Sequence, residues 1–171
     1  MKKILKYIIT FISVLLIRLL PFRAPNVEPI MSVIMPIGKI YGGIMSFMFG
    51  ATSIIIYDSI TSGIGVWTFV TGITYGLVGL LSYWFLRNKS GWASYASYAI
   101  IATVAYDVIT GLIPGPLFYH QPFMVALVGQ IPFTMMHLLG NVSFAILLSP
   151  ILERWLIKES PVHLTSSVKG V

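Results

Sequence analysis

Long apolar runs fill most of this 171-residue chain and constrain its fold more than any other feature. An apolar run of about 20 residues can cross a bilayer as a helix. We expect six such segments, of which the third is the shortest: 4–20, 30–49, 51–64, 66–86, 92–113 and 122–152. Charged residues make up only 9% of the chain and the mean hydropathy is +0.89. This composition predicts a polytopic membrane protein and excludes a water-soluble fold.

Basic residues stand at the ends of the apolar segments, where they act as orientation signals and do not indicate a nucleic-acid partner. Six crossings from a cytoplasmic N-terminus place the following residues inside: Lys2, Lys3, Lys6, Arg87, Lys89, Arg154, Lys158 and Lys169. Arg18 and Arg23 then lie outside, and Lys39 lies within a span. The prediction is an all-α, compact bundle of six transmembrane helices over residues 1–158. Both termini are cytoplasmic, and residues 159–171 form a polar cytoplasmic tail.

The pattern Tyr-Asp-x-Ile-Thr occurs twice, at residues 57–61 and 106–110, each time inside an apolar segment. The chain has only five acidic residues, and Asp58 and Asp107 of these copies are two of them. A carboxylate at membrane depth costs a few kcal/mol or more unless it meets a polar cavity or a partner. In the predicted topology both carboxylates lie in the outer half of the membrane, which indicates a solute site framed by repeated segments.

A structural alternative exists for these acids, because they can also cap loops or pair with Lys39 and Arg23. Lys39 lies well inside the second segment, so its side chain either reaches back to the interface or pairs with an acid. The loop after the first segment holds three prolines together with Arg23, Asn26 and Glu28. It is either a plain connector with a surface Arg–Glu pair or a lid over an outward-facing pocket.

Polar and aromatic residues near the last segment add further candidates. His120, Gln121 and Gln130 stand at or just inside its outer start. His137 and Asn141 are four residues apart on one helix face, which favours hydrogen bonds to another helix over metal binding.

The aromatic residues Trp67, Tyr75 and Tyr119 are candidates for stacking on a flat solute. Trp67 and Tyr119 are equally consistent with an outer belt of interfacial aromatics. Rows of small residues, among them Ser46, Gly50 and Gly79, predict close approach of helix backbones.

Motifs of enzymes are missing, so no catalytic activity, metal or cofactor is expected. The chain has no cysteine, which excludes disulfides and thiolate chemistry. It also lacks His-Glu-x-x-His, Gly-x-Ser-x-Gly and P-loop patterns. Without a P-loop the chain does not use ATP by itself to drive transport.

The layout resembles the S components of energy-coupling factor (ECF) transporters, which capture vitamins and related solutes at the prokaryotic plasma membrane. The resemblance rests on six short apolar segments, both ends inside, a polar proline-containing loop after the first, and a Gly-rich second segment leading to Tyr57-Asp58-Ser59-Ile60-Thr61. It implies an outward-facing solute site, a transmembrane coupling subunit and two ATPase subunits as partners. It assigns to the site Arg23, Asn26, Glu28, Asp58, Asp107, His120, Gln121 and Gln130. Many S components carry Ala-x-x-x-Ala in the first helix, and this chain does not.

Two other classes fit part of the pattern. A structural scaffold of the MreD type would bind no ligand and would present a protein interface instead. The paired acids Asp58 and Asp107 argue against it, because a scaffold has no need to bury them. A small ion-coupled carrier would use the same two acids as titrating groups.

Overall fold

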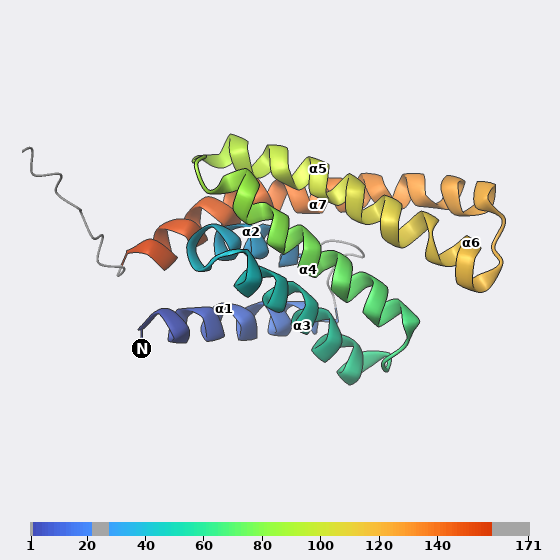
Figure 1. The fold of residues 1–171 in the computed structure, drawn as a ribbon, viewed down its shortest axis with the longest axis horizontal. Helices are drawn as coiled ribbons and strands as arrows, with labels where there is room; N and C mark the ends of the chain where they lie inside the picture. The colour runs from blue at the N-terminus through green and yellow to red at the C-terminus, as the bar shows by residue number, and fades with distance from the viewer. Residues whose placement is uncertain (1, 22–27, 159–171) are drawn as a thin grey trace, which may run out of the picture.

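A computed structural model describes residues 2–21 and 28–158, and this part of the chain is helical without a strand. Arg23, Asn26 and the predicted tail, 159–171, lie outside the described residues. The helices are α1 (Lys2–Arg18), α2 (Ile30–Tyr41), α3 (Gly43–Thr61), α4 (Val66–Leu86), α5 (Trp92–Leu112), α6 (Pro114–Tyr119) and α7 (Phe123–Ile157). They form one elongated bundle in which α1 and the end of α7 reach the same end (Figure 1).

Four stretches of the described chain are long and apolar enough to cross a membrane: α3, α4, α5 continued through α6, and α7. The predicted all-helical membrane bundle is confirmed to this extent. The predicted segment 66–86 coincides with α4, and α5 begins at Trp92 as expected. Because α1 has 17 residues and α2 has 12, six full crossings and cytoplasmic termini stay predictions.

The predicted boundary between the second and third segments is wrong. The sequence suggested one span over residues 30–49, but the chain turns at Gly42, whose φ of 94° lies in the left-handed region that glycine tolerates. At 1.5 Å per residue α2 is about 18 Å long, roughly half of a hydrocarbon core. Residues 30–38 are all buried. The helix α2 is therefore a half-length helix inside the bundle, and Glu28 stands just before it.

Close contact between α3 and α4 depends on small residues, as predicted. A Cβ atom added at Gly50 would lie 2.8 Å from the carbonyl oxygen of Tyr75. One added at Gly79 would lie 2.7 Å from the carbonyl oxygen of Ser46. Backbone atoms cannot move aside as a flexible side chain can, so these glycines set the distance between the two helices.

We expect the Gly79→Ala variant to lower the free energy of unfolding by about 1–3 kcal/mol, because the added methyl group pushes α4 away from α3. Gly72→Ala is the matched control on the same helix, since its added Cβ would meet its nearest atom at an ordinary 3.5 Å. Thermal unfolding in detergent micelles measures both variants. Equal melting temperatures for the two would contradict the packing described here.

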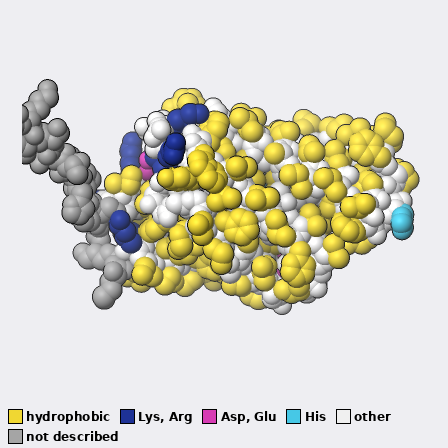
Figure 2. All heavy atoms as spheres, in the orientation of Figure 1, with side chains coloured by type: hydrophobic (Ala, Val, Ile, Leu, Met, Phe, Trp, Pro, Cys, Tyr) yellow, Lys and Arg dark blue, Asp and Glu magenta, His cyan; other side chains and the backbone are white. Residues whose placement is uncertain are grey.

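Basic side chains gather at the end of the bundle where α1 begins and α7 finishes (Figure 2). Lys39 lies at this end, where its Nζ pairs with Glu153 and donates to the backbone oxygen of Lys89 at 2.6 Å. The hydroxyl of Tyr95 donates to the second Glu153 oxygen at 2.9 Å. Of the two interpretations of Lys39, the structure has the ion pair. Its partner is Glu153, and neither Asp58 nor Asp107 is involved.

Candidate functional site

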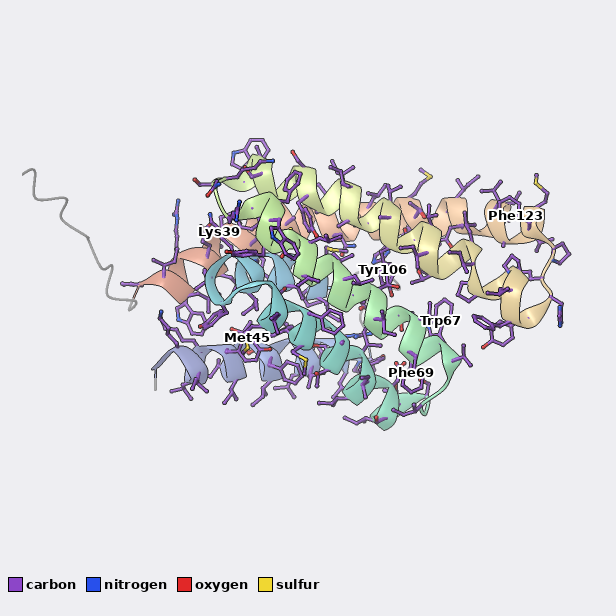
Figure 3. The ribbon with its side chains drawn as sticks, viewed as in Figure 1. Lys39, Met45, Trp67, Phe69, Tyr106 and Phe123 are labelled. Atoms are coloured by element: carbon purple, nitrogen blue, oxygen red, sulfur yellow. The ribbon has the colours of Figure 1, made fainter. Side chains whose placement is uncertain are left out.

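A polar cavity of about 190 Å³, here called the inner cavity, lies between five of the helices. Helices α1, α3, α4, α5 and α7 contribute to it directly, and Glu28 joins them from two residues before α2. The lining residues are Arg18, Glu28, Ile54, Asp58, Trp67, Thr71, Tyr75, Tyr106, Phe133 and His137. Figure 3 shows Trp67 and Tyr106 in the part of the bundle away from Lys39 and the basic end.

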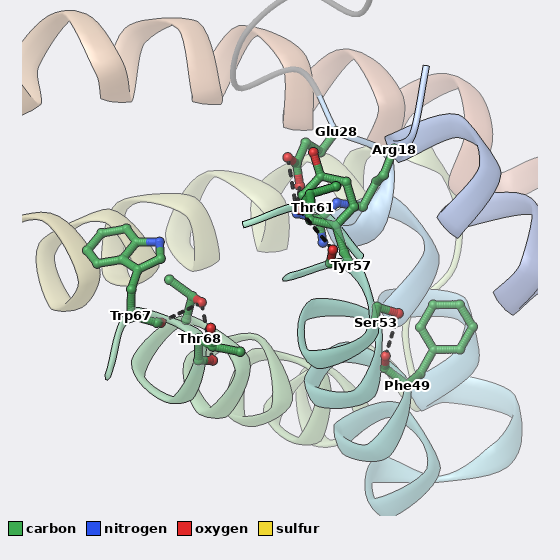
Figure 4. Close-up of polar contacts among 9 residues, drawn as sticks. Arg18, Glu28, Phe49, Ser53, Tyr57, Thr61, Trp67 and Thr68 are labelled. Atoms are coloured by element: carbon green, nitrogen blue, oxygen red, sulfur yellow. Dashed lines mark hydrogen bonds and ion pairs between the residues drawn. The ribbon is translucent and has the colours of Figure 1, made fainter. Parts of the chain in front are cut away.

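Arg18, which the sequence analysis treated only as an orientation signal on the outer side, is a buried residue that lines the inner cavity. The residue is only 6% exposed, and its Nη2 lies 3.3 Å from Oε2 of Glu28. The guanidinium also stacks 4.1 Å from the ring centre of Tyr57 (Figure 4). Its Nε and Nη1 are buried and have no hydrogen-bond partner among the described residues. A buried arginine with two unused donors is unfavourable unless something else meets them.

Asp58 lines the inner cavity and is 8% exposed. Among the described residues, ion pairs join Arg18 to Glu28, Lys39 to Glu153 and His137 to Asp107. The Asp58 carboxylate therefore has no ion-pair partner in this part of the chain. The structural pairing with Lys39 that the sequence allowed is not formed.

Asp107 has a different role from Asp58, although the two stand in matching motifs. Its Oδ1 lies 2.7 Å from Nδ1 of His137, and the two side chains are 1% and 3% exposed. The two groups therefore share one buried hydrogen bond between α5 and α7. Asn141, one turn further on, donates to Thr103 Oγ1 at 2.9 Å. The predicted hydrogen bonds of His137 and Asn141 to another helix are thus confirmed.

Aromatic rings surround the inner cavity. The rings of Tyr75 and Tyr106 are 4.3 Å apart at a 46° tilt, and Tyr106 meets His137 edge-on at 5.6 Å. Phe133 also meets the same imidazole edge-on, with ring centres 5.6 Å apart. The Asp107 carboxylate and the two rings together hold His137 in one orientation beside the cavity.

A second, larger space of about 370 Å³, here called the outer pocket, lies toward the end opposite the basic residues. Trp67 and Phe133 line both spaces, so these two rings form a shared wall. The remaining lining residues come from α5, α6 and α7 and the turn between them: Thr110, Gly111, Gly115, Tyr119, Gln121, Val125, Ala126, Gly129 and Gln130.

Two glycines make room for the amide side chains of the outer pocket. A Cβ atom added at Gly111 would overlap Oε1 of Gln130, and one added at Gly115 would overlap Oε1 of Gln121. The Gln130 amide also donates to Thr134 Oγ1 at 3.2 Å. Gly111 and Gly115 are therefore explained by the space that the Gln130 and Gln121 side chains occupy. The sequence had suggested that these glycines allow close contact between helix backbones.

Six of the ten predicted site residues lie at one of the two spaces or directly behind the wall of one. Glu28, Asp58 and Trp67 line the inner cavity. Gln121 and Gln130 line the outer pocket. Asp107 lines neither space but forms a hydrogen bond with His137, which lines the inner cavity. His120 is exposed at the end of α6 and lines neither space. The structure also does not bring Lys39 to either space. Arg23 and Asn26 lie outside the described residues.

Sequence reasoning missed Arg18 and Tyr106 as site residues and predicted for His137 only a hydrogen bond to another helix. In the sequence, a buried arginine at the end of an apolar helix looks the same as a surface arginine that serves as an orientation signal. The one available clue was Glu28, a lone acid in the loop that follows. Comparison with known proteins adds nothing to this, because no family model, curated protein or solved structure matches the chain.

We expect the Gly111→Ala variant to displace the Gln130 side chain and to lower the free energy of unfolding by about 1–2 kcal/mol, because the added Cβ would overlap Oε1 of Gln130 and disturb its hydrogen bond to Thr134. Gly129→Ala is the matched control, since it lines the same pocket and its added Cβ would meet no atom within 4 Å. Thermal unfolding of the purified variants in detergent micelles measures the effect. Equal melting temperatures for the two variants would show that Gly111 does not set the position of Gln130.

Proposed function

We propose that this protein is the solute-capturing membrane subunit of an uptake transporter, of the same kind as the S components of ECF transporters. The solute binds in the inner cavity and enters through the outer pocket. The observation that supports this most directly is the set of buried polar groups around a space of about 190 Å³. Arg18 keeps two unused donors there, and Asp58 has no ion partner among the described residues. Such groups are unfavourable in an empty scaffold but serve a bound solute well.

The direction of uptake follows from the charge distribution. Lys and Arg residues favour the cytoplasmic side, and they gather at the end of the bundle that is remote from the outer pocket. Both spaces then face outward from the cell membrane, as the capture of a vitamin-like solute from outside requires. Localisation in a prokaryotic plasma membrane belongs to the same proposal.

Energy for uptake must come from partners, because the chain carries no ATP-binding motif. In the proposed assembly, a transmembrane coupling subunit and two cytoplasmic ATPase subunits supply it. The first helix has no Ala-x-x-x-Ala pair. We therefore propose that the coupling subunit is dedicated to this protein or docks on another face of the bundle.

A second candidate function is a small ion-coupled carrier. The observation that favours it is the position of two titratable groups, Asp58 and His137, on one cavity. Uptake by such a carrier would need a proton or sodium gradient and no ATPase partner. Uptake measured in vesicles that contain this chain alone, with and without an imposed gradient, separates the two candidates.

The test of solute capture is mass spectrometry of small molecules released from the detergent-purified protein. We expect one compound in stoichiometric amount in the wild type, and its loss from an Asp58→Ala variant. Ser59→Ala, at an exposed neighbouring position, is the control and should retain the compound. A wild-type protein that is empty, and whose melting temperature no vitamin or nucleobase shifts, would overturn solute capture in favour of a scaffold of the MreD type.

A further inference from the structure

We infer that the inner cavity recognises a positively charged group, so that the solute is a small organic cation. The inference rests on the proposed function, because it assigns a chemical class to the solute of that same cavity. It depends on two independent features of the lining: an excess of carboxylates over cationic groups, and aromatic rings on several sides of the space.

The charges of the described residues at the cavity do not cancel. Three carboxylates stand at or directly behind its wall, those of Glu28, Asp58 and Asp107. Arg18 balances Glu28 through their ion pair. Even a fully protonated His137 balances only Asp107, to which it is bonded.

Among the described residues, Asp58 is the carboxylate at the cavity whose charge no cationic side chain balances. It lines the cavity and is more than nine-tenths buried. A carboxylate removed from water without a partner is strongly unfavourable, and a cation placed beside it removes most of that penalty. The charge excess therefore favours a cationic solute over a neutral one, and it opposes an anionic one.

The aromatic rings favour the same class of solute. The faces of aromatic rings attract cations, and the attraction grows when the cation has lost its water. Trp67 and Tyr75 line the cavity from α4, Tyr106 lines it from α5 and Phe133 from α7. A quaternary or protonated amine with an apolar surround fits a space that combines such rings with one carboxylate.

Arg18 defines a second feature of the solute. Its charge is already engaged by Glu28 and by the ring of Tyr57, so it does not require an anion. Its unused Nε and Nη1 donors still need acceptors. A neutral oxygen on the same molecule, such as a hydroxyl or carbonyl group, would meet them. The inferred class is thus an organic cation that also carries a neutral hydrogen-bond acceptor.

Three small probes of nearly equal shape test the inference on the whole purified protein in detergent. Choline carries the cation and a hydroxyl group, 3,3-dimethylbutan-1-ol is its neutral counterpart, and 3,3-dimethylbutanoate is an anionic one. We expect choline to raise the melting temperature at concentrations at least about tenfold lower than the neutral alcohol, and the anion to have no effect. Asp58→Asn should abolish the preference for the cation. Asp58→Glu, which keeps the carboxylate, and Ser59→Asn, at an exposed neighbour, should retain it.

The outcomes separate this inference from the proposed function. Protection by the neutral or anionic probe that equals or exceeds protection by choline would overturn the cation inference and leave solute capture standing. The same holds for a cation preference that persists in Asp58→Asn. If no probe protects, the compound released from the purified protein decides: a cation lost in Asp58→Asn supports the inference, and a neutral or anionic compound overturns it. Protein that neither holds a compound nor responds to any probe would overturn both.

Discussion

Replacing Asp107 with leucine is expected to lower the free energy of unfolding by about 3–5 kcal/mol, the range for removing one partner of a buried charged pair. The substitution leaves Nδ1 of His137 without its acceptor in a place where the imidazole is 3% exposed. Water cannot replace the lost carboxylate there, so the polar ring stays buried and unsatisfied. Unfolding of the purified protein in mixed micelles, followed by circular dichroism, measures the change.

The double variant Asp107→Leu/His137→Leu provides the internal control. Removing both partners leaves no orphaned polar group, so the double variant should regain a large part of the stability that the single one loses. Val108→Leu, at a neighbouring position that is 46% exposed, should change little. If the single and double variants are equally unstable, the Asp107–His137 pair does not explain the effect of the substitution.

Helix bounds were predictable where breakers flank an apolar run. Helix α4 follows Gly63 and Gly65 and ends at the Arg87 turn, and its predicted bounds are those observed. The half-length helix α2 was not predictable from hydropathy, because the run of apolar residues continues through Gly42. A glycine within such a run has the same pattern whether it lets two helices approach or adopts a left-handed turn.

The acids of the site could be predicted, but their separate roles could not. Asp58 and Asp107 stand in the same five-residue pattern. Only the fold shows that Asp58 lines a cavity while Asp107 forms a hydrogen bond with His137. That partner lies on another helix, and no local spacing relates the two residues. The burial of Arg18 was not predictable for a similar reason, since its partner Glu28 stands ten residues further along the chain.

Substitution of Asp58 by asparagine is expected to have the opposite effect on stability. Among the described residues no ion pair is lost, and a buried charge disappears, so the solute-free variant should be at least as stable as the wild type. The affinity for the co-purifying solute should fall by about 2–5 kcal/mol, which is roughly 30-fold to several thousand-fold. Isothermal titration and thermal unfolding of the same samples measure both quantities.

The two substitutions together separate a binding carboxylate from a structural one. Asp107→Leu reduces stability with and without solute, because the contact it removes lies within the protein. Asp58→Asn reduces only the stabilisation that solute adds, because the contact it removes forms with the solute. If Asp58→Asn instead unfolds at a lower temperature in the absence of solute, the Asp58 carboxylate stabilises the fold itself. The cavity would then need another residue to hold the charged part of its ligand.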